Sequence, residues 1–255
     1  MFNPVIVYEY PCNERVRAFL RAEYLFERFF YFLKGEDAHH HQIAVTTLFE
    51  ILDMCERSDV RGMVLQDLER QRVALMGWRE HPGVASQRLD AMLDAMQQAS
   101  EQLSAQGRLG ANLKENEWLS SLRGRFAVPG GCSRVDLPSY YAWQLRPAEQ
   151  RRQAIQSWAQ SFTPVQEAIS LLLKVLRNAG DPIDHVAIEG NYQEMLGGKT
   201  FQLLRVWLDE QAHVFPEMSA NKYVIWVRFA QQDNENRPQP LTKNIAFKLA
   251  RCQIH

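Results

Sequence analysis

Hydrophobic side chains recur every three or four positions along most of the chain up to Gly180, which is the spacing of one face of an α-helix. The clearest stretch begins after Asn13, a residue suited to capping a helix, and runs to about Lys34. Its apolar positions are Val16, Phe19, Ala22, Phe26, Phe29 and Leu33. Other faces of the same stretch carry further apolar residues, among them Tyr24, Phe30 and Tyr31. We therefore expect a second surface to cover this helix.

Similar spacing predicts more helices, separated by short breaks at proline, glycine or a capping residue. The predicted ranges are 41–56, 59–78, 86–105, 116–125, 147–161 and 163–180. Long amphipathic helices joined by short connections are typical of an antiparallel bundle. A helical bundle is therefore expected from this part of the chain.

Shorter runs rich in β-branched and aromatic residues predict strands at 5–8, 132–137, 186–192, 201–208, 222–229 and 243–249. Gln231 to Pro240, rich in Asn, Gln and Pro, is expected to be an exposed loop. The predicted fold class is α+β, a helical bundle domain packed with a smaller antiparallel β domain. The helical domain would comprise residues 13–125 and 147–180, and the β domain residues 1–12, 126–146 and 181–255.

Composition narrows the classes of protein that this chain can belong to. The 255 residues include 29 basic and 30 acidic side chains, so the excess of positive charge typical of nucleic-acid-binding domains is absent. No run of about 18 uncharged apolar residues predicts a membrane span, and Met1 to Tyr10 does not resemble a signal peptide. The four cysteines are far apart and form no Cys-x-x-Cys pair. We expect a cytoplasmic protein with reduced thiols, bound to neither nucleic acid nor membrane.

No motif in the sequence predicts catalysis, a metal or a cofactor. His39, His40 and His41 are adjacent, would point about 100° apart on a helix, and are expected to lie in a solvated loop. Gly197-Gly198-Lys199-Thr200 lacks the first glycine of a phosphate-binding loop and is expected to be a turn between strands. The carboxylate pairs Glu50 and Asp53, Asp90 and Asp94, and Glu115 and Glu117 are expected on solvated or ion-paired faces. We expect no enzyme.

Arginine clusters are the more informative feature. Arg17, Arg21 and Arg28 share one face of the first predicted helix. Arg57 and Arg61 lie four positions apart at a helix junction, and Arg123 and Arg125 precede the glycine turn. Alternation in the strand 222–229 would place Lys222, Trp226 and Arg228 on one side of a sheet. These cations either pair with nearby acidic residues or form a basic site for an acidic, flexible peptide, which guanidinium groups bind well.

Several stretches resemble the ZapD family of FtsZ-associated cell-division proteins. They are YPCNERVR at Tyr10 to Arg17, LRAE at Leu20 to Glu23, LDMCERSDVR at Leu52 to Arg61, DLERQ at Asp67 to Gln71, PGGCSRVDLP at Pro129 to Pro138 and GNYQ at Gly190 to Gln193. Their order and spacing extend over nearly the whole chain. One departure is Tyr141, where relatives tend to have histidine.

The resemblance implies a homodimer that binds the carboxy-terminal tail of FtsZ through a basic surface, joins FtsZ filaments and supports the division ring at midcell. It implies no catalytic activity and no cofactor. The matched basic positions are Arg17, Arg21, Arg57, Arg61, Arg123, Arg125, Lys222 and Arg228, and Trp226 is added as a stacking partner. We expect Arg21, Arg123, Lys222 and Arg228 to converge on one surface. The alternative is a helical regulatory or nucleic-acid-binding module that uses the same arginines on phosphates, and an enzyme with an unrecognised site ranks third.

Overall fold

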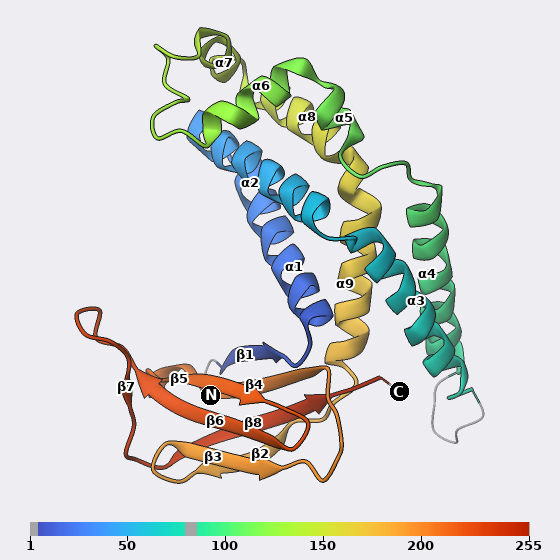
Figure 1. The fold of residues 1–255 in the computed structure, drawn as a ribbon, viewed down its shortest axis with the longest axis vertical. Helices are drawn as coiled ribbons and strands as arrows, with labels where there is room; N and C mark the ends of the chain where they lie inside the picture. Colours follow the sequence, from blue (N-terminus) through green and yellow to red (C-terminus); the bar gives the residue numbers. More distant parts are fainter. Residues whose placement is uncertain (1–4, 80–85, 255) are drawn as a thin grey trace. The chain divides into compact units, whose positions relative to one another are not determined.

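The structure is a computed structural model that describes residues 5–79 and 86–254. The chain forms two compact units, one of residues 21–172 and the other of residues 1–20 and 173–255. The first unit consists of helices and the second is dominated by strands (Figure 1). The fold class is α+β, as the periodicity predicts.

Helix α1 shows why the hydrophobic pattern is informative. It spans Glu14–Leu33, and the side chain of Asn13 accepts a hydrogen bond from the backbone N–H of Val16 at 2.8 Å, as expected of a cap. All six predicted apolar positions are buried. Tyr24, Phe30 and Tyr31 remain exposed, so the expected second surface is not supplied within the described chain.

The other helices include one close to each of the six predicted ranges, and two short helices, 111–115 and 138–144, that were not predicted. They are α2 (Ala38–Arg57), α3 (Val60–Met76), α4 (Ser86–Ala105), α5 (Ala111–Glu115), α6 (Glu117–Phe126), α7 (Pro138–Gln144), α8 (Ala148–Ala159), the 3₁₀ turn η1 (Gln160–Phe162) and α9 (Thr163–Arg177). Helix α3 packs against α4, and α2 against α8. Buried leucines such as Leu48, Leu68 and Leu103 fill the spaces between these helices.

One predicted strand is wrong. Residues 132–137 form turns, and helix α7 follows them. Pro138 suits the first turn of a helix, and Tyr140 and Trp143 are three positions apart and both buried. Their rings stack on each other, and Trp143 also stacks on Trp158 of α8. Aromatic packing within the helical unit therefore determines the conformation of this stretch, which short-range pattern does not show.

The second unit is an antiparallel β-sandwich. One sheet has the order β1-β4-β8-β2, and the other has the order β3-β6-β5, with β7 beside β6. The bounds are β1 (Val5–Pro11), β2 (Ile183–Ala187), β3 (Asn191–Met195), β4 (Leu203–Asp209), β5 (Phe215–Ala220), β6 (Val224–Gln231), β7 (Gln239–Pro240) and β8 (Ile245–Cys252), with the 3₁₀ turn η2 (Glu210–Ala212) after β4. Side chains from both sheets form one core, including Val206, Val227 and Phe247.

Strand boundaries differ from the predicted ones in two places. The predicted strand 186–192 is two strands, β2 and β3, connected by a tight turn in which Gly190 has a φ of 74°. Strand β5 was not predicted, because Pro216 interrupts an otherwise strand-like run. Proline is tolerated there since β5 lies at an edge of its sheet.

Candidate functional site

Strand β6 presents a large aromatic and a cation to solvent. Ile225, Val227 and Phe229 are buried in the sandwich core, and Trp226 and Arg228 between them are exposed. This is the alternation that a strand with one buried face requires. The predicted pairing of Trp226 and Arg228 on one side of a sheet is therefore present.

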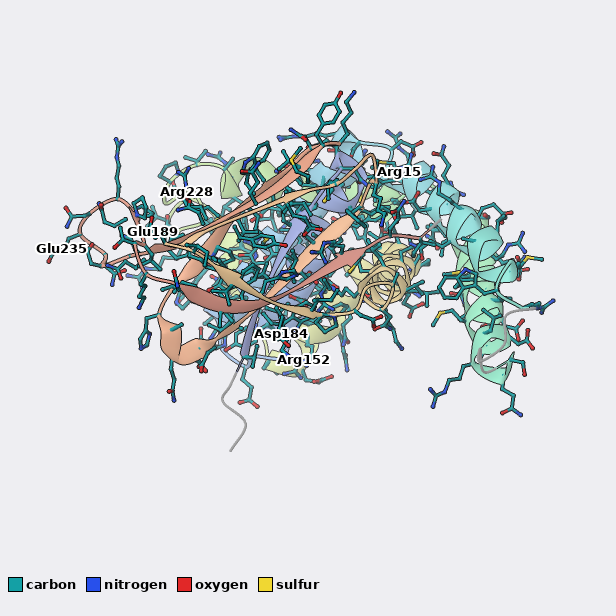
Figure 2. The ribbon with its side chains drawn as sticks, turned by 90° about the horizontal axis from the view of Figure 1, so that it is seen from below. Arg15, Arg152, Asp184, Glu189, Arg228 and Glu235 are labelled. Atoms are coloured by element: carbon teal, nitrogen blue, oxygen red, sulfur yellow. The ribbon has the colours of Figure 1, made fainter. Side chains whose placement is uncertain are left out.

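Neighbouring strands extend this surface on both sides. The register places Arg228 between Asn191 of β3 and Glu217 of β5, and it places Trp226 between Gln193 and Ser219. These residues line an open hollow with a volume of about 660 Å³, and Arg228 is labelled in Figure 2. We call this surface the β6 face; it consists of Asn191, Gln193, Glu217, Ser219, Trp226 and Arg228.

Arg228 is available to bind a partner. Its side chain is exposed and makes no ion pair or hydrogen bond with any residue of the described ranges. A guanidinium can bind a carboxylate through two parallel hydrogen bonds and can stack on an aromatic ring. The β6 face therefore combines a cation that is unpaired among the described residues, an exposed indole and amide side chains in one shallow site.

Lys222 lies in the turn before β6, not within the strand as predicted. The Asn221 side chain accepts hydrogen bonds from the backbone N–H groups of Tyr223 and Val224 and so holds the turn. The Lys222 ammonium lies 4.8 Å from the centre of the Tyr223 ring. The lysine is exposed but takes its position from this turn, not from strand alternation.

The arginines of α1 differ in their environments. Arg17 pairs with Glu14 at 3.1 Å and lies over the ring of Tyr10. Arg28 pairs with Glu50 at 2.6 Å and donates to the hydroxyl of Thr47. Arg21 is exposed and has no such partner in the described chain. Of the three, Arg21 alone has a guanidinium that is unpaired among the described residues.

Arg123 belongs to an internal ion-pair cluster. Its guanidinium donates to the carboxylates of Asp53 and Glu56, and Lys114 binds Glu56 at 2.5 Å. The hydrogen bonds from Arg123 and then Lys114 lower the pKa of Glu56 to about 2. Because two carboxylates already bind Arg123, a partner would have to compete with both of them.

The remaining predicted arginines fall into two groups. Arg61 donates to the backbone carbonyls of Leu103 and Ser104, at 3.1 and 2.8 Å, so it caps the end of α4. Arg57 and Arg125 are exposed and unpaired within the part of the chain that the structure describes. The predicted carboxylate pairs are partly ion-paired, as expected: Glu50 with Arg28, Asp53 with Arg123 and Asp90 with Arg79.

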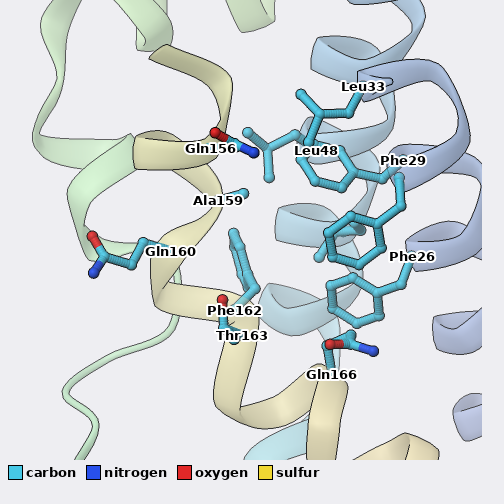
Figure 3. Close-up of a pocket in the computed structure, with 12 residues that line it drawn as sticks. Phe26, Phe29, Leu33, Leu48, Gln156, Ala159, Gln160, Phe162, Thr163 and Gln166 are labelled. Atoms are coloured by element: carbon cyan, nitrogen blue, oxygen red, sulfur yellow. The ribbon is translucent and has the colours of Figure 1, made fainter. Parts of the chain in front are cut away.

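An apolar pocket lies within the helical unit, between α1, α2 and the segment from α8 to α9. Its volume is about 270 Å³, and it is lined by Phe26, Phe29, Leu33, Leu48 and Phe162, with Gln156, Gln160 and Gln166 at its margin (Figure 3). Phe30, which is exposed on α1, also contributes to its wall. None of the described residues that line the pocket has a charged side chain.

The histidines occupy the start of α2, so the prediction of a solvated loop is wrong. Asp37 caps this helix by accepting from the backbone N–H of His39. His39 and His40 are exposed, whereas His41 is buried and accepts a hydrogen bond at Nδ1 from Arg151 at 3.0 Å. Among the described residues, no three His, Cys, Asp or Glu side chains are grouped in a way that could hold a metal ion.

Other chemistry that the sequence raised is accounted for by local structure. Gly197 and Gly198 have φ values of 56° and 85° in the turn between β3 and β4, which is the predicted turn. Burial raises the pKa of Cys12 and of Cys55 to about 12, so both thiols stay protonated. In the described ranges, no helix combines the length and hydrophobicity needed to cross a membrane.

The predicted site residues are divided between the two units. Lys222, Trp226 and Arg228 belong to the strand unit, as does Arg17, whereas Arg21, Arg57, Arg61, Arg123 and Arg125 belong to the helical unit. Their convergence on one surface stays a prediction. Sequence reasoning missed Glu217, Asn191 and Gln193. Their place beside Arg228 and Trp226 depends on sheet register, for which the only local signal is the alternation within β3 and β5.

Comparison with known proteins adds the decisive observation. A family described as ZapD, cell division protein, matches residues 20–228. The cell division protein ZapD of Bordetella pertussis strain Tohama I is 54% identical over 248 residues, which cover 97% of this chain and 98% of the relative.

The chain belongs to the ZapD family of cell-division proteins. The ZapD protein of Bordetella petrii is 55% identical over 248 residues, 97% of this chain and 99% of the relative. The family match includes all of β6 up to Arg228, together with β3, β5 and the helices from α2 to α9. The chain therefore acts in cell division, and the ZapD relatives extend over both of its units.

Proposed function

We propose that this protein binds the carboxy-terminal tail of FtsZ and, as a homodimer, crosslinks FtsZ filaments in the midcell ring of the cytoplasm. The observation that supports the proposal best is the β6 face, where the unpaired cation Arg228 adjoins the exposed indole of Trp226 in an open hollow. Membership of the ZapD family supports the role in division. The activity requires neither catalysis nor a cofactor.

An open hollow on a sheet surface suits an extended peptide. An acidic side chain of the tail would bind Arg228 through two hydrogen bonds, and a flat or apolar side chain would stack on Trp226. The amides of Asn191 and Gln193 can bind polar groups of the peptide, since both side chains are exposed. Lys222 and Arg21 would add longer-range attraction, because both are exposed cations.

Arg57 and Arg125 would contribute in the same way as Arg21, because their guanidinium groups are exposed and unpaired in the described chain. Arg17, Arg61 and Arg123 already bind protein groups. They would contribute to tail binding only by exchanging these partners, so we expect substitutions there to act mainly on stability.

Crosslinking requires two sites in one particle. A monomer with one tail site can only decorate a filament, whereas a two-fold dimer can join two filaments through contacts that are individually weak. Tyr24, Phe30 and Tyr31 of α1 are 59%, 41% and 73% exposed, and a soluble monomer rarely leaves such a group of aromatic residues uncovered. We propose that α1 supplies part of the dimer interface.

Charge reversal at Arg228 tests the site. Arg228→Glu should weaken binding of an FtsZ tail peptide by at least tenfold, since a central arginine contact is worth about 2 kcal/mol. The matched control is Arg237→Glu, which reverses an exposed arginine in a loop of the same unit. Circular dichroism should show both variants folded, and calorimetry should show that only Arg228→Glu loses affinity.

Co-sedimentation with FtsZ polymers tests the partner. The wild-type protein should pellet with full-length FtsZ and stay in the supernatant with FtsZ that lacks its tail. Binding should weaken as salt is raised from about 50 to about 300 mM, because the screening length falls below about 10 Å within this range and the attraction between exposed charges is reduced. Equal pelleting with both forms of FtsZ, or equal affinity of the wild type and Arg228→Glu, would contradict the proposal.

A further inference from the structure

Glu217 is the acidic residue of the β6 face and lies directly opposite Arg228. The two residues are register partners on neighbouring antiparallel strands, and both side chains are exposed. Opposite residues of such a pair have Cβ atoms about 5 Å apart. Nevertheless, the two groups form no ion pair, and neither has another charged partner in the described chain. The β6 face therefore carries one positive and one negative charge side by side, both available to a ligand.

From this arrangement we infer that Glu217 determines which acidic ligands the β6 face accepts. The inference rests on the proposed function, because it concerns the same surface. A carboxylate that binds Arg228 must approach within a few ångströms of the Glu217 carboxylate, and like charges at that distance repel. A single ligand carboxylate flanked by a cation or a hydrogen-bond donor satisfies both residues. A ligand with consecutive negative charges does not.

The rest of the β6 face cannot offset this repulsion. Asn191, Gln193, Ser219 and Trp226 are uncharged, and one of the two N–H groups of the Asn191 amide donates to the carbonyl of Glu189 at 2.8 Å. Arg228 is the one cation of the β6 face. Its cross-strand partner Glu217 is closer to it than the screening length of about 8 Å at physiological salt, so salt does not screen the repulsion between Glu217 and a carboxylate bound to Arg228. The surface thus favours a peptide of mixed charge over polyglutamate or nucleic acid.

A variant that removes only this charge tests the inference. Glu217→Gln keeps the shape of the side chain, and Glu210→Gln is the matched control, since Glu210 is exposed in the turn after β4 of the same unit. The probes are a labelled hexaglutamate peptide, a single-stranded oligonucleotide and the FtsZ tail peptide, titrated by fluorescence anisotropy at low salt. Glu217→Gln should bind hexaglutamate about two- to fivefold more tightly than wild type, the size of an exposed charge interaction.

The ratio of affinities is the measure of specificity. In Glu217→Gln the preference for the FtsZ tail over hexaglutamate should fall about two- to fivefold, and the gain for hexaglutamate should disappear in the double variant with Arg228→Gln. Glu210→Gln should leave the ratio unchanged. The oligonucleotide should follow hexaglutamate.

Two outcomes overturn the inference. One is an equal affinity ratio in Glu217→Gln and Glu210→Gln, and the other is no measurable binding of hexaglutamate to Glu217→Gln. Failure of the FtsZ tail to bind either the wild type or Glu217→Gln would instead contradict the proposed function. The hexaglutamate comparison decides the role of Glu217 independently of that result.

Discussion

Arginines that look equivalent in the sequence differ in the structure by whether another residue already binds them. Arg123 and Arg228 both lie in predicted basic clusters. Arg123 is bound by Asp53 and Glu56, whereas Arg228 has no ion-pair partner among the residues that the structure describes. Asp53 is 70 positions before Arg123. Periodicity assigns a residue to a face of its own element, but it carries no information on such distant partners. The sequence therefore identifies the candidate arginines, but it does not show which of them are free to bind a partner.

His41 provides a prediction on pH at the same scale. Burial, and then the nearby Arg151, lowers the pKa of His41, and its Nδ1 accepts from the Arg151 guanidinium. Protonation would break that bond and place two cations together. The unfolded chain binds a proton near pH 6.5 and the folded chain only at lower pH, so the free energy of unfolding should fall as pH drops below about 6.5.

Urea titrations of the wild type and His41→Gln from pH 7.5 to 5 measure this effect. The free energy of unfolding of the variant should fall less steeply as the pH drops. The difference in slope from the wild type corresponds to at most one proton, or about 1.4 kcal/mol per pH unit. His185→Gln is the comparison, because burial, and then the nearby Arg251, lowers the pKa of His185 as well. An unchanged slope in His41→Gln would show that the buried imidazole does not govern acid sensitivity.

At the scale of elements, prediction succeeded where one face of a helix or strand is buried and failed where aromatic packing or sheet position decides. Helix α1 and the alternation in β6 follow directly from hydrophobic spacing. Helix α7 forms because Tyr140 and Trp143 join an aromatic stack, and β5 forms at a sheet edge despite Pro216. Glu217 was missed from the predicted site because it lies on β5, the strand that was not predicted.

The cap of α1 can be tested directly. Asn13→Ala removes the acceptor for the backbone N–H of Val16 and should destabilise the protein by about 1 kcal/mol, whereas Asn13→Ser should retain most of the stability. Urea denaturation gives both values. Equal midpoints for the wild type and Asn13→Ala would mean that the cap contributes nothing measurable.

For the whole molecule, the sequence indicated the α+β class and the family but not the relation between binding site and assembly. The β6 face lies in the strand unit, and the exposed aromatic residues lie on the part of α1 within the helical unit. Tail binding and dimerisation would then use separate surfaces. Each should be removable without loss of the other, because substitutions at sites that share no partner residue usually act independently.

Tyr31→Glu tests this separation. At micromolar concentration, light scattering should give the wild type twice the chain mass of 29.6 kDa. Tyr31→Glu should lower the measured mass toward that of the monomer, because a dimer interface does not readily bury an unpaired carboxylate. The variant should still bind the tail peptide yet fail to bundle FtsZ in sedimentation and electron microscopy, since bundling needs two sites. Val73→Glu, at an exposed apolar position of α3, is the matched control and should remain dimeric. A monomeric wild type would contradict the crosslinking model, and a fully dimeric Tyr31→Glu would exclude this face of α1 from the interface.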